Sequence, residues 1–140
     1  MDSLFLDTNV LLDAIGERAP FFDDTVAVFA LLEIGKAKGA FGGMSLATID
    51  YVLGATPPRQ KLAKFSALRK YLDVAPLGQA EVDRALKRGQ PDFEDGLQWE
   101  SAKSWGATHL LTRNVRDFPV SRALPVLTPT QYLEALDTPP

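Results

Sequence analysis

Short apolar segments alternate with longer helical patterns along this 140-residue chain, and this alternation limits the folds that it can adopt. The apolar segments are too short for helices and suit buried strands. Strands separated by helices predict parallel pairing, because parallel neighbours need a crossover connection that is usually a helix. We therefore predict an α/β fold, a three-layer α/β/α sandwich around a mainly parallel central sheet.

Local signals place the individual elements. Ser45 and Asp92 are expected helix caps, and Gly39 and Gly106 expected helix stops. The expected strands are residues 3–6, 40–45, 73–77, 109–112 and 125–127. The expected helices are residues 9–15, 20–38, 45–53, 58–72, 79–88, 93–105 and 129–136. No repeat or linker divides the chain, so residues 1–136 are expected to form one domain, with residues 137–140 as a C-terminal tail.

Composition excludes several classes of protein. Hydrophobic residues make up 46% and charged residues 24%, as in ordinary globular domains. The absence of cysteine excludes disulfide scaffolds, cysteine zinc sites and thiol nucleophiles. An acid at position 2 and an apolar run of only three residues do not resemble a signal peptide, and no run is long enough for a membrane span. We expect a soluble, cytoplasmic protein without a membrane partner.

Charge is unevenly distributed, although the net charge is only −3. Residues 34–72 contain seven Lys or Arg and one acid, Asp50. The basic segment is either the solvated face of one amphipathic helix or a surface that binds a polyanion. The sequence leaves both alternatives open.

Acidic residues gather where parallel strands are expected to end. Asp7 follows the first strand, and Asp117 lies five residues beyond Thr112, at the end of the fourth. Asp92 and Asp95 open the helix before that strand, one turn apart on one face. Ligands of open parallel sheets bind at the carboxyl ends of the strands. Taken singly, Asp7 and Asp92 are better explained as helix caps, but the joint placement of the acids favours a site.

Clustered carboxylates repel one another, and a hard cation with oxygen ligands offsets that repulsion. Mg²⁺ and Mn²⁺ both suit such ligands, and the sequence does not distinguish between them. Two such ions can assist the hydrolysis of a phosphodiester bond.

Three segments, in this order, resemble PIN domains, and the closest branch resembles the VapC-type toxins of bacterial toxin–antitoxin pairs. Residues 6–13 (LDTNVLLD) resemble the opening motif of the family, residues 92–98 (DFEDGLQ) its central acidic helix, and residues 111–118 (LTRNVRDF) its late strand and loop. The resemblance covers essentially the whole chain. It implies a Rossmann-like sandwich, an Mg²⁺- or Mn²⁺-dependent endoribonuclease acting on RNA, a homodimer and a cognate antitoxin.

The resemblance also implies roles for individual residues. It makes Asp7, Asp95 and Asp117 the catalytic metal ligands. In the nuclease hypothesis, Asp92 or Glu94 is a further catalytic acid that tunes the metal-bound water or completes the metal shell. It makes Asn9 a hydrogen-bonding support of the Asp7 loop. The polar neighbours that it places at the cleft are Thr112, Asn114 and Thr48.

Two departures from the family pattern support an alternative function. Thr48 stands where the family usually has an acid, and Asn114 stands where it often has Asp. A catalytically weakened PIN-like module that binds RNA or a protein partner is therefore the second hypothesis. A phosphatase with Asp7 as nucleophile is ranked low, because Asn9 replaces the second acid of its D-x-D-x-T pattern and Leu11 its threonine.

The remaining candidates are basic or aromatic. Arg113 and Arg116 flank the late acidic loop and are candidate phosphate contacts, with ordinary surface charge as the equal alternative. His109 is the single histidine and is expected to be structural. Trp99 and Trp105 are expected in the core rather than as platforms for RNA bases.

Overall fold

The computed structural model describes residues 1–138 and confirms the predicted α/β sandwich. Its sheet has the strand order β3–β2–β1–β4–β5, and every neighbouring pair is parallel. The strands are β1 (Asp2–Leu6), β2 (Ala37–Gly42), β3 (Asp73–Ala75), β4 (His109–Leu111) and β5 (Val126–Leu127). The strand order reverses at β1, so the carboxyl end of β1 lies at the switch point where such sheets bind ligands.

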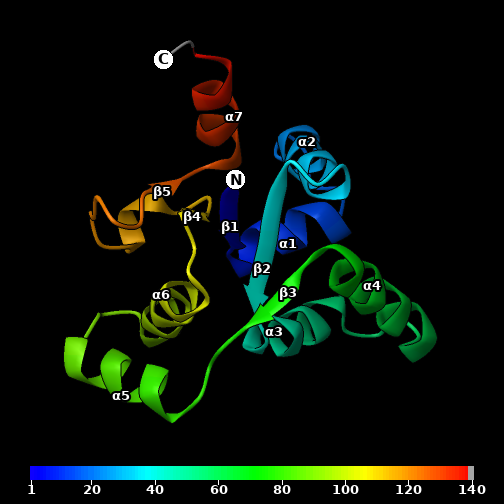
Figure 1. Cartoon of the computed structure of the whole chain (residues 1–140). Coiled ribbons are helices and arrows are strands. Elements are labelled where there is room, and N and C mark those ends of the chain that lie inside the picture. Colours follow the sequence, from blue (N-terminus) through cyan, green and yellow to red (C-terminus); the bar gives the residue numbers. More distant parts are fainter. Residues whose placement is uncertain (139–140) are drawn as a thin grey trace.

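Helices cover both faces of the sheet. In Figure 1, α5 and α6 lie together on one side of the strands, and α1 to α4 lie on the other. The helices are α1 (Thr8–Ile15), α2 (Phe22–Glu33), α3 (Met44–Leu53), α4 (Pro58–Tyr71), α5 (Gln79–Arg88), α6 (Phe93–Trp105) and α7 (Pro129–Asp137), with a short 3₁₀ helix, η1 (Val115–Asp117). Over residues 1–138, no helix is both long and apolar enough to cross a membrane.

The central strand supplies side chains to two separate cores. Leu4 and Leu6 pack with α1, α2, α3, α4 and α7, whereas Phe5 packs against Trp99 and Ala102 of α6. All three β1 side chains are fully buried. This arrangement follows from the two-residue period of a strand, which sends successive side chains to opposite faces.

The region between α2 and β2 differs from the prediction. Helix α2 ends at Glu33, Gly35 has a left-handed φ of 74°, and β2 begins at Ala37. Gly39 is therefore not a helix stop but a strand residue. A Cβ atom there would lie 2.5 Å from Leu72 Cδ2, so the core leaves no room for a side chain. The chain turns at the earlier glycine, where the left-handed conformation is needed.

Smaller differences concern single positions. Helix α3 begins after Gly43, and Ser45 lies in its first turn instead of capping it. Leu62 of α4 is 63% exposed. Helix α7 extends to Asp137, one residue beyond the predicted domain end, and Thr138 follows it as the cap. The rest of the predicted tail, residues 139–140, lies outside the described residues.

Candidate active site at the carboxyl edge of the sheet

Asp7 occupies the position where β1 ends and α1 begins. It is the N-cap of α1, and its carboxylate is only 6% exposed. One carboxylate oxygen, Oδ1, accepts hydrogen bonds from the backbone N–H of Thr8 (2.8 Å) and from Gln98 Nε2 (3.1 Å). The helix-cap interpretation of Asp7 is therefore correct, and the same side chain also stands at the predicted site.

The other oxygen of Asp7, Oδ2, is held from α1 and from the residue that follows β4. Thr112 Oγ1 donates to it at 2.8 Å, and Asn9 Nδ2 donates at 3.4 Å. Asn9 Oδ1 in turn accepts from the backbone N–H of Arg113 at 3.2 Å. Thr112 Oγ1 also accepts from the backbone N–H of Asn114 at 3.1 Å. The side chains of Asn9 and Thr112 thus tie the loop after β4 to the loop after β1.

Gln98 is a site residue that sequence reasoning missed. It is fully buried on α6, and its Nε2 lies 3.2 Å from both Thr8 Oγ1 and Ser45 Oγ, in addition to Asp7. Thr8 and Ser45 are themselves joined at 2.7 Å. Gln98 follows Asp95 by three residues, so the helical period that paired Asp92 with Asp95 also places Gln98 on this face. That spacing was the available signal.

Gly42, the last residue of β2, makes room for Gln98. A Cβ atom at this position would lie 2.4 Å from Gln98 Oε1. Any side chain there would push the amide away from Asp7. The glycine is therefore required by close approach of a side chain, not by its backbone conformation.

Thr48 lies outside this network. It is half-buried on α3, and within residues 1–138 no hydrogen bond joins it to Asp7. Ser45, three residues earlier, is the α3 residue that reaches the site, and it is fully buried. Thr48 was placed at the cleft by its position in the family pattern, and that role stays a prediction, whereas Ser45 was not identified as a site residue from the sequence.

Asp92, Glu94 and Asp95 lie at the start of α6. Asp92 caps the helix and accepts a hydrogen bond from the backbone N–H of Asp95 at 3.2 Å. Burial is the largest cause that raises the pKa of Asp95 to about 7. Burial also raises the pKa of Glu94. The charges that further raise the pKa of Asp95 belong to Asp7, Asp92, Asp117 and Glu94. Electrostatically, these acids form one group.

Asp117, at the end of η1, adds its charge to this group. It ends the 3₁₀ helix η1, its side chain is exposed, and its backbone carbonyl accepts from Gln90 Nε2 at 2.8 Å. Asn114 and Arg116 are also exposed in this loop. Arg116 is therefore placed where a phosphate could reach it, and its predicted contact stays a prediction.

Arg113 has a different environment from the one predicted. Its Nε lies 2.9 Å from Oδ2 of Asp13, a residue of α1 that is 1% exposed. Its guanidinium also lies over the ring of Phe21, 4.4 Å from the centroid. Burial raises the pKa of Asp13, and the charges of Arg113 and Arg18 oppose this rise. Arg113 thus anchors the loop after β4 to α1, and the structure gives its side chain a protein partner instead of an open surface.

The donor chemistry of the site fits a hard divalent cation, but the predicted ligand set is not gathered. Within residues 1–138, no three His, Cys, Asp or Glu side chains are arranged as a metal-ligand group. The structure therefore does not arrange Asp7, Asp95 and Asp117 as a three-ligand group, although Asp7 and Asp117 both lie close enough to Asp95 for their charges to raise its pKa. Mg²⁺ often binds through one or two carboxylates and keeps several waters. Asp7 and Asp95 fit that simpler mode.

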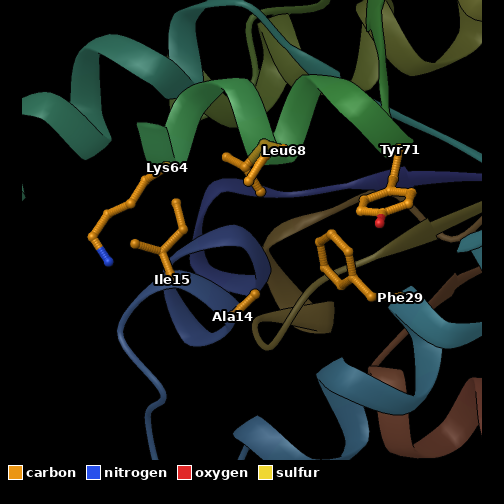
Figure 2. Close-up of a pocket in the computed structure, with 7 residues that line it drawn as sticks. Ala14, Ile15, Phe29, Lys64, Leu68 and Tyr71 are labelled. Carbon is orange, nitrogen blue, oxygen red and sulfur yellow. The ribbon is translucent and has the colours of Figure 1, made fainter. Parts of the chain in front are cut away.

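An apolar hollow of about 280 Å³ lies away from the acids. It is formed by α1, α2 and α4, and Figure 2 shows Phe29 and Tyr71 pointing toward one another across it, with Ile15 and Leu68 beside them. Lys64 is the single charged residue of its lining. Apart from Lys64 and the hydroxyl of Tyr71, its lining is apolar, which is the character of a contact surface.

Known proteins resemble the chain in sequence and in fold. The family model of the PIN domain matches residues 3–116. Ribonuclease VapC1 of Aquifex aeolicus (strain VF5) is 28% identical over 142 residues, which cover 98% of this chain and 97% of that protein. The matched family region contains Asp7 and Asp95 and ends one residue before Asp117.

Two solved structures share the fold. One is VapBC2 from Rickettsia felis bound to a DNA fragment from their promoter, with a TM-score of 0.63 and 17% identity, covering 89% of this chain and 96% of that chain. The other is FitAcB from Neisseria gonorrhoeae, with a TM-score of 0.60 and 19% identity, covering 91% of this chain and 98% of that chain. At these identities the likeness establishes the fold alone.

The raised pKa of Asp95 predicts a pH-dependent gain in stability for Asp95→Asn. The ordinary pKa of the group is 3.8 and its folded value is about 7, so the folded state binds more protons between these values. The free energy of unfolding therefore falls as pH rises across this range, and the amide removes that loss. In metal-free buffer, we expect the variant to melt a few degrees above wild type at about pH 8 and equally near pH 4.

Thermal melts over this pH range check the prediction. Asp73→Asn, an exposed substitution with the same change of charge, serves as the control and should show no such gain. An equal shift for Asp95→Asn at both pH values would contradict the assignment.

Proposed function

The chain belongs to the PIN domain family, and from this premise we propose that it is an Mg²⁺- or Mn²⁺-dependent endoribonuclease that hydrolyses phosphodiester bonds of RNA. One observation carries the proposal. The buried, hydrogen-bonded carboxylate of Asp7 lies close enough to the half-buried Asp95 to raise the pKa of Asp95. The likeness to Ribonuclease VapC1 over nearly the whole of both chains supports it.

The residues of the site have separate roles in the proposed reaction. Hydrogen bonds from Gln98 and Thr112 fix the two oxygens of Asp7, so this carboxylate is oriented before any ligand binds. Asp95 changes protonation near neutral pH, which makes its charge sensitive to a cation beside it. Asp7 and Asp95 would hold a divalent cation, which when bound would stabilise charge at a phosphate and lower the pKa of a water molecule. Asp117 and Asp92 carry further negative charge at the same edge.

A second candidate function is a PIN-like module that binds RNA or a protein without cutting. Its specific support is that the carboxylates do not meet as a three-ligand group within residues 1–138, and that α3 supplies Ser45 instead of an acid. This candidate predicts RNA or partner affinity without turnover. Cleavage and metal binding separate it from the nuclease.

The nuclease proposal predicts cleavage of RNA that depends on both the metal and the acids. With a mixed pool of labelled RNA, we expect cutting in Mg²⁺ or Mn²⁺ and none in chelator. Asp7→Asn and Asp95→Asn should each lower the rate by about 100-fold or more, because each removes a charge that the reaction needs. Asp73→Asn, an exposed acid outside the site, should cut like wild type. Undiminished cleavage by both site variants would refute the assignment.

We also propose that the protein is the toxin of a pair whose antitoxin covers the apolar hollow between α1, α2 and α4. Two of the structural neighbours are named as VapBC2 and FitAcB assemblies. The hollow is an open apolar surface, and burying such a surface against a partner is favourable. An RNA-cleaving toxin acts in the cytoplasm, so the proposal places the protein there.

A charge placed in the hollow should prevent antitoxin binding. Ala67 lines the hollow and is exposed on α4. We expect Ala67→Glu to abolish co-purification with the antitoxin that the wild-type protein retains and to leave RNA cleavage unchanged. Ala80→Glu makes the same change on α5, on the other side of the sheet, and should leave co-purification intact. Loss of the partner with both variants, or with neither, would count against this surface.

The proposal includes a homodimer formed through α3 and α4. An ion pair of 3.1 Å between Lys61 and Asp50 holds these helices together. Large apolar side chains remain exposed beside it: Tyr51 is 86% exposed and Leu62 is 63% exposed. A self-complementary patch of this kind suits a two-fold interface.

Substitution within the patch should therefore give a monomer. We expect Leu62→Asp to sediment as a monomer in analytical ultracentrifugation while wild type sediments as a dimer. Leu86→Asp is the matched control, since Leu86 is also 63% exposed but lies on α5. A wild-type monomer, or a dimer in both variants, would show that this patch is not the interface.

A further inference from the structure

Three basic side chains converge on one buried carboxylate where α6 packs against α5. Glu100 is 1% exposed, and its Oε1 lies 3.1 Å from Arg84 Nε and 3.5 Å from Lys103 Nζ. Its Oε2 lies 3.4 Å from Arg88 Nε. A buried carboxylate needs a cation for its stability, but one partner would serve. The positive charges beyond the first are held in place by Glu100 but are not neutralised by it.

The convergence leaves a surplus of positive charge around an open hollow. Arg84, Arg88 and Lys103 remain 37–46% exposed and, with Lys87, line a hollow of about 270 Å³ that contains Glu100. Glu81 also pairs with Arg84, at 3.1 Å. Four cations therefore stand against two carboxylates, and the excess faces solvent. Fixed cations with free donors are suited to phosphate oxygens.

A second hollow adjoins the charged one and has a different character. Its volume is about 540 Å³, and Arg88 and Lys103 line both hollows. Its lining also includes the apolar residues Trp99, Leu124 and Val120. Trp99 and Leu124 are each only 2% exposed, whereas Val120 is fully exposed and is the apolar side chain that a base can reach. The Arg88 guanidinium lies over the Trp99 ring, 5.8 Å from its centroid. Charged donors beside an apolar surface match the phosphate and the base of one nucleotide.

Helix α6 connects these hollows to the acidic site. It carries Asp95 in its first turn and Lys103 two turns later, about 12 Å along the axis. Asp95, Trp99 and Lys103 follow one another at intervals of four residues, so they lie along one side of the helix. A strand of a few nucleotides spans this distance.

We infer that the paired hollows on α5 and α6 bind a single-stranded segment of the RNA substrate, with phosphates on Lys87, Arg88 and Lys103 and a base against Val120. This inference rests on the proposed nuclease function and names where its substrate lies outside the acids. It also assigns RNA binding to these hollows and not to the basic helix α4, which covers the opposite face of the sheet (Figure 1).

Binding of a short fluorescent oligouridine in chelator, where no cutting occurs, tests the inference. The test variant is Lys87→Gln with Lys103→Gln, which leaves Arg84 and Arg88 paired with Glu100 so that the fold is kept. Its affinity should fall about tenfold, and the slope of log Kd against log salt should fall by about 1.4, since each phosphate contact on a single strand contributes about 0.7.

Two controls make the result specific. Lys64→Gln with Lys70→Gln removes the same charge from α4 and should leave both affinity and slope unchanged. Val120→Asp should lower the affinity several-fold, whereas Ile34→Asp, also at an exposed apolar position, should not. The salt slope separates binding from stability, because a variant that merely loosens the fold keeps the slope of its remaining active fraction.

The outcomes separate this inference from the proposed function. Unchanged affinity and slope in the α5–α6 variant, or an equal loss in the α4 variant, overturn the inference even if metal-dependent cleavage is found. If the α5–α6 variant loses affinity while the wild-type protein shows no cleavage, the hollows are supported as an RNA site and the nuclease function is rejected. Polyglutamate competing as well as RNA, with no effect of Val120→Asp, would identify a surface for acidic proteins and overturn the inference.

Discussion

The buried carboxylate of Asp7 is the interaction on which the rest of the site depends. An ionised carboxylate away from water is costly unless each of its oxygens is hydrogen-bonded. Its four donors come from α1, from α6 and from the residue after β4, which are far apart in the sequence. Ser45 extends the same network to α3 through Thr8 and Gln98. The correct assembly of the sheet and its helices is thus a condition for keeping this one charge in place.

Asp95 shows the opposite balance. Its carboxylate is half-buried next to other acids, and its raised pKa records that the folded chain disfavours the charged form. Such a group weakens the protein at neutral pH and gains favourable partners only when positive charge is nearby. Asp7 is stabilised by the protein alone, whereas Asp95 is left partly unsatisfied. The site therefore combines a carboxylate that is fixed in orientation, Asp7, with one whose protonation responds to nearby positive charge, Asp95.

The sequence predicted well what local signals determine. Helix α6 has the predicted bounds, because Asp92 caps it and Gly106 ends it in a left-handed conformation. Parallel pairing of the strands, and the gathering of acids at one edge of the sheet, could also be predicted from the alternation of elements. Neither prediction requires the strand order to be known. The start of β2 was not, because Ala37–Gly42 is built from small residues that give no clear period, and Gly35 and Gly39 compete as helix stops.

Within the site, acids and their immediate neighbours could be named from sequence, but their buried partners could not. Gln98 acts through contacts with residues more than fifty positions away. Gly42 matters only because that amide needs its space. The ion pair of Arg113 was not predictable for a similar reason: nothing near it in sequence shows that Asp13 is buried against it. These features depend on tertiary packing and carry no local pattern.

The uninterrupted course of α6 from the acidic edge to Lys103 has a consequence for how this protein can change over evolutionary time. Adding or deleting one residue within the helix rotates everything beyond it by about 100°. Such a change would remove Trp99 from the core and Glu100 from its cations while Asp95 stayed in place. Loops such as that between β4 and β5 can vary in length, but the length of α6 between Asp95 and Lys103 cannot change without displacing the residues beyond the change. Descendants of this chain are expected to vary its residues and conserve its register.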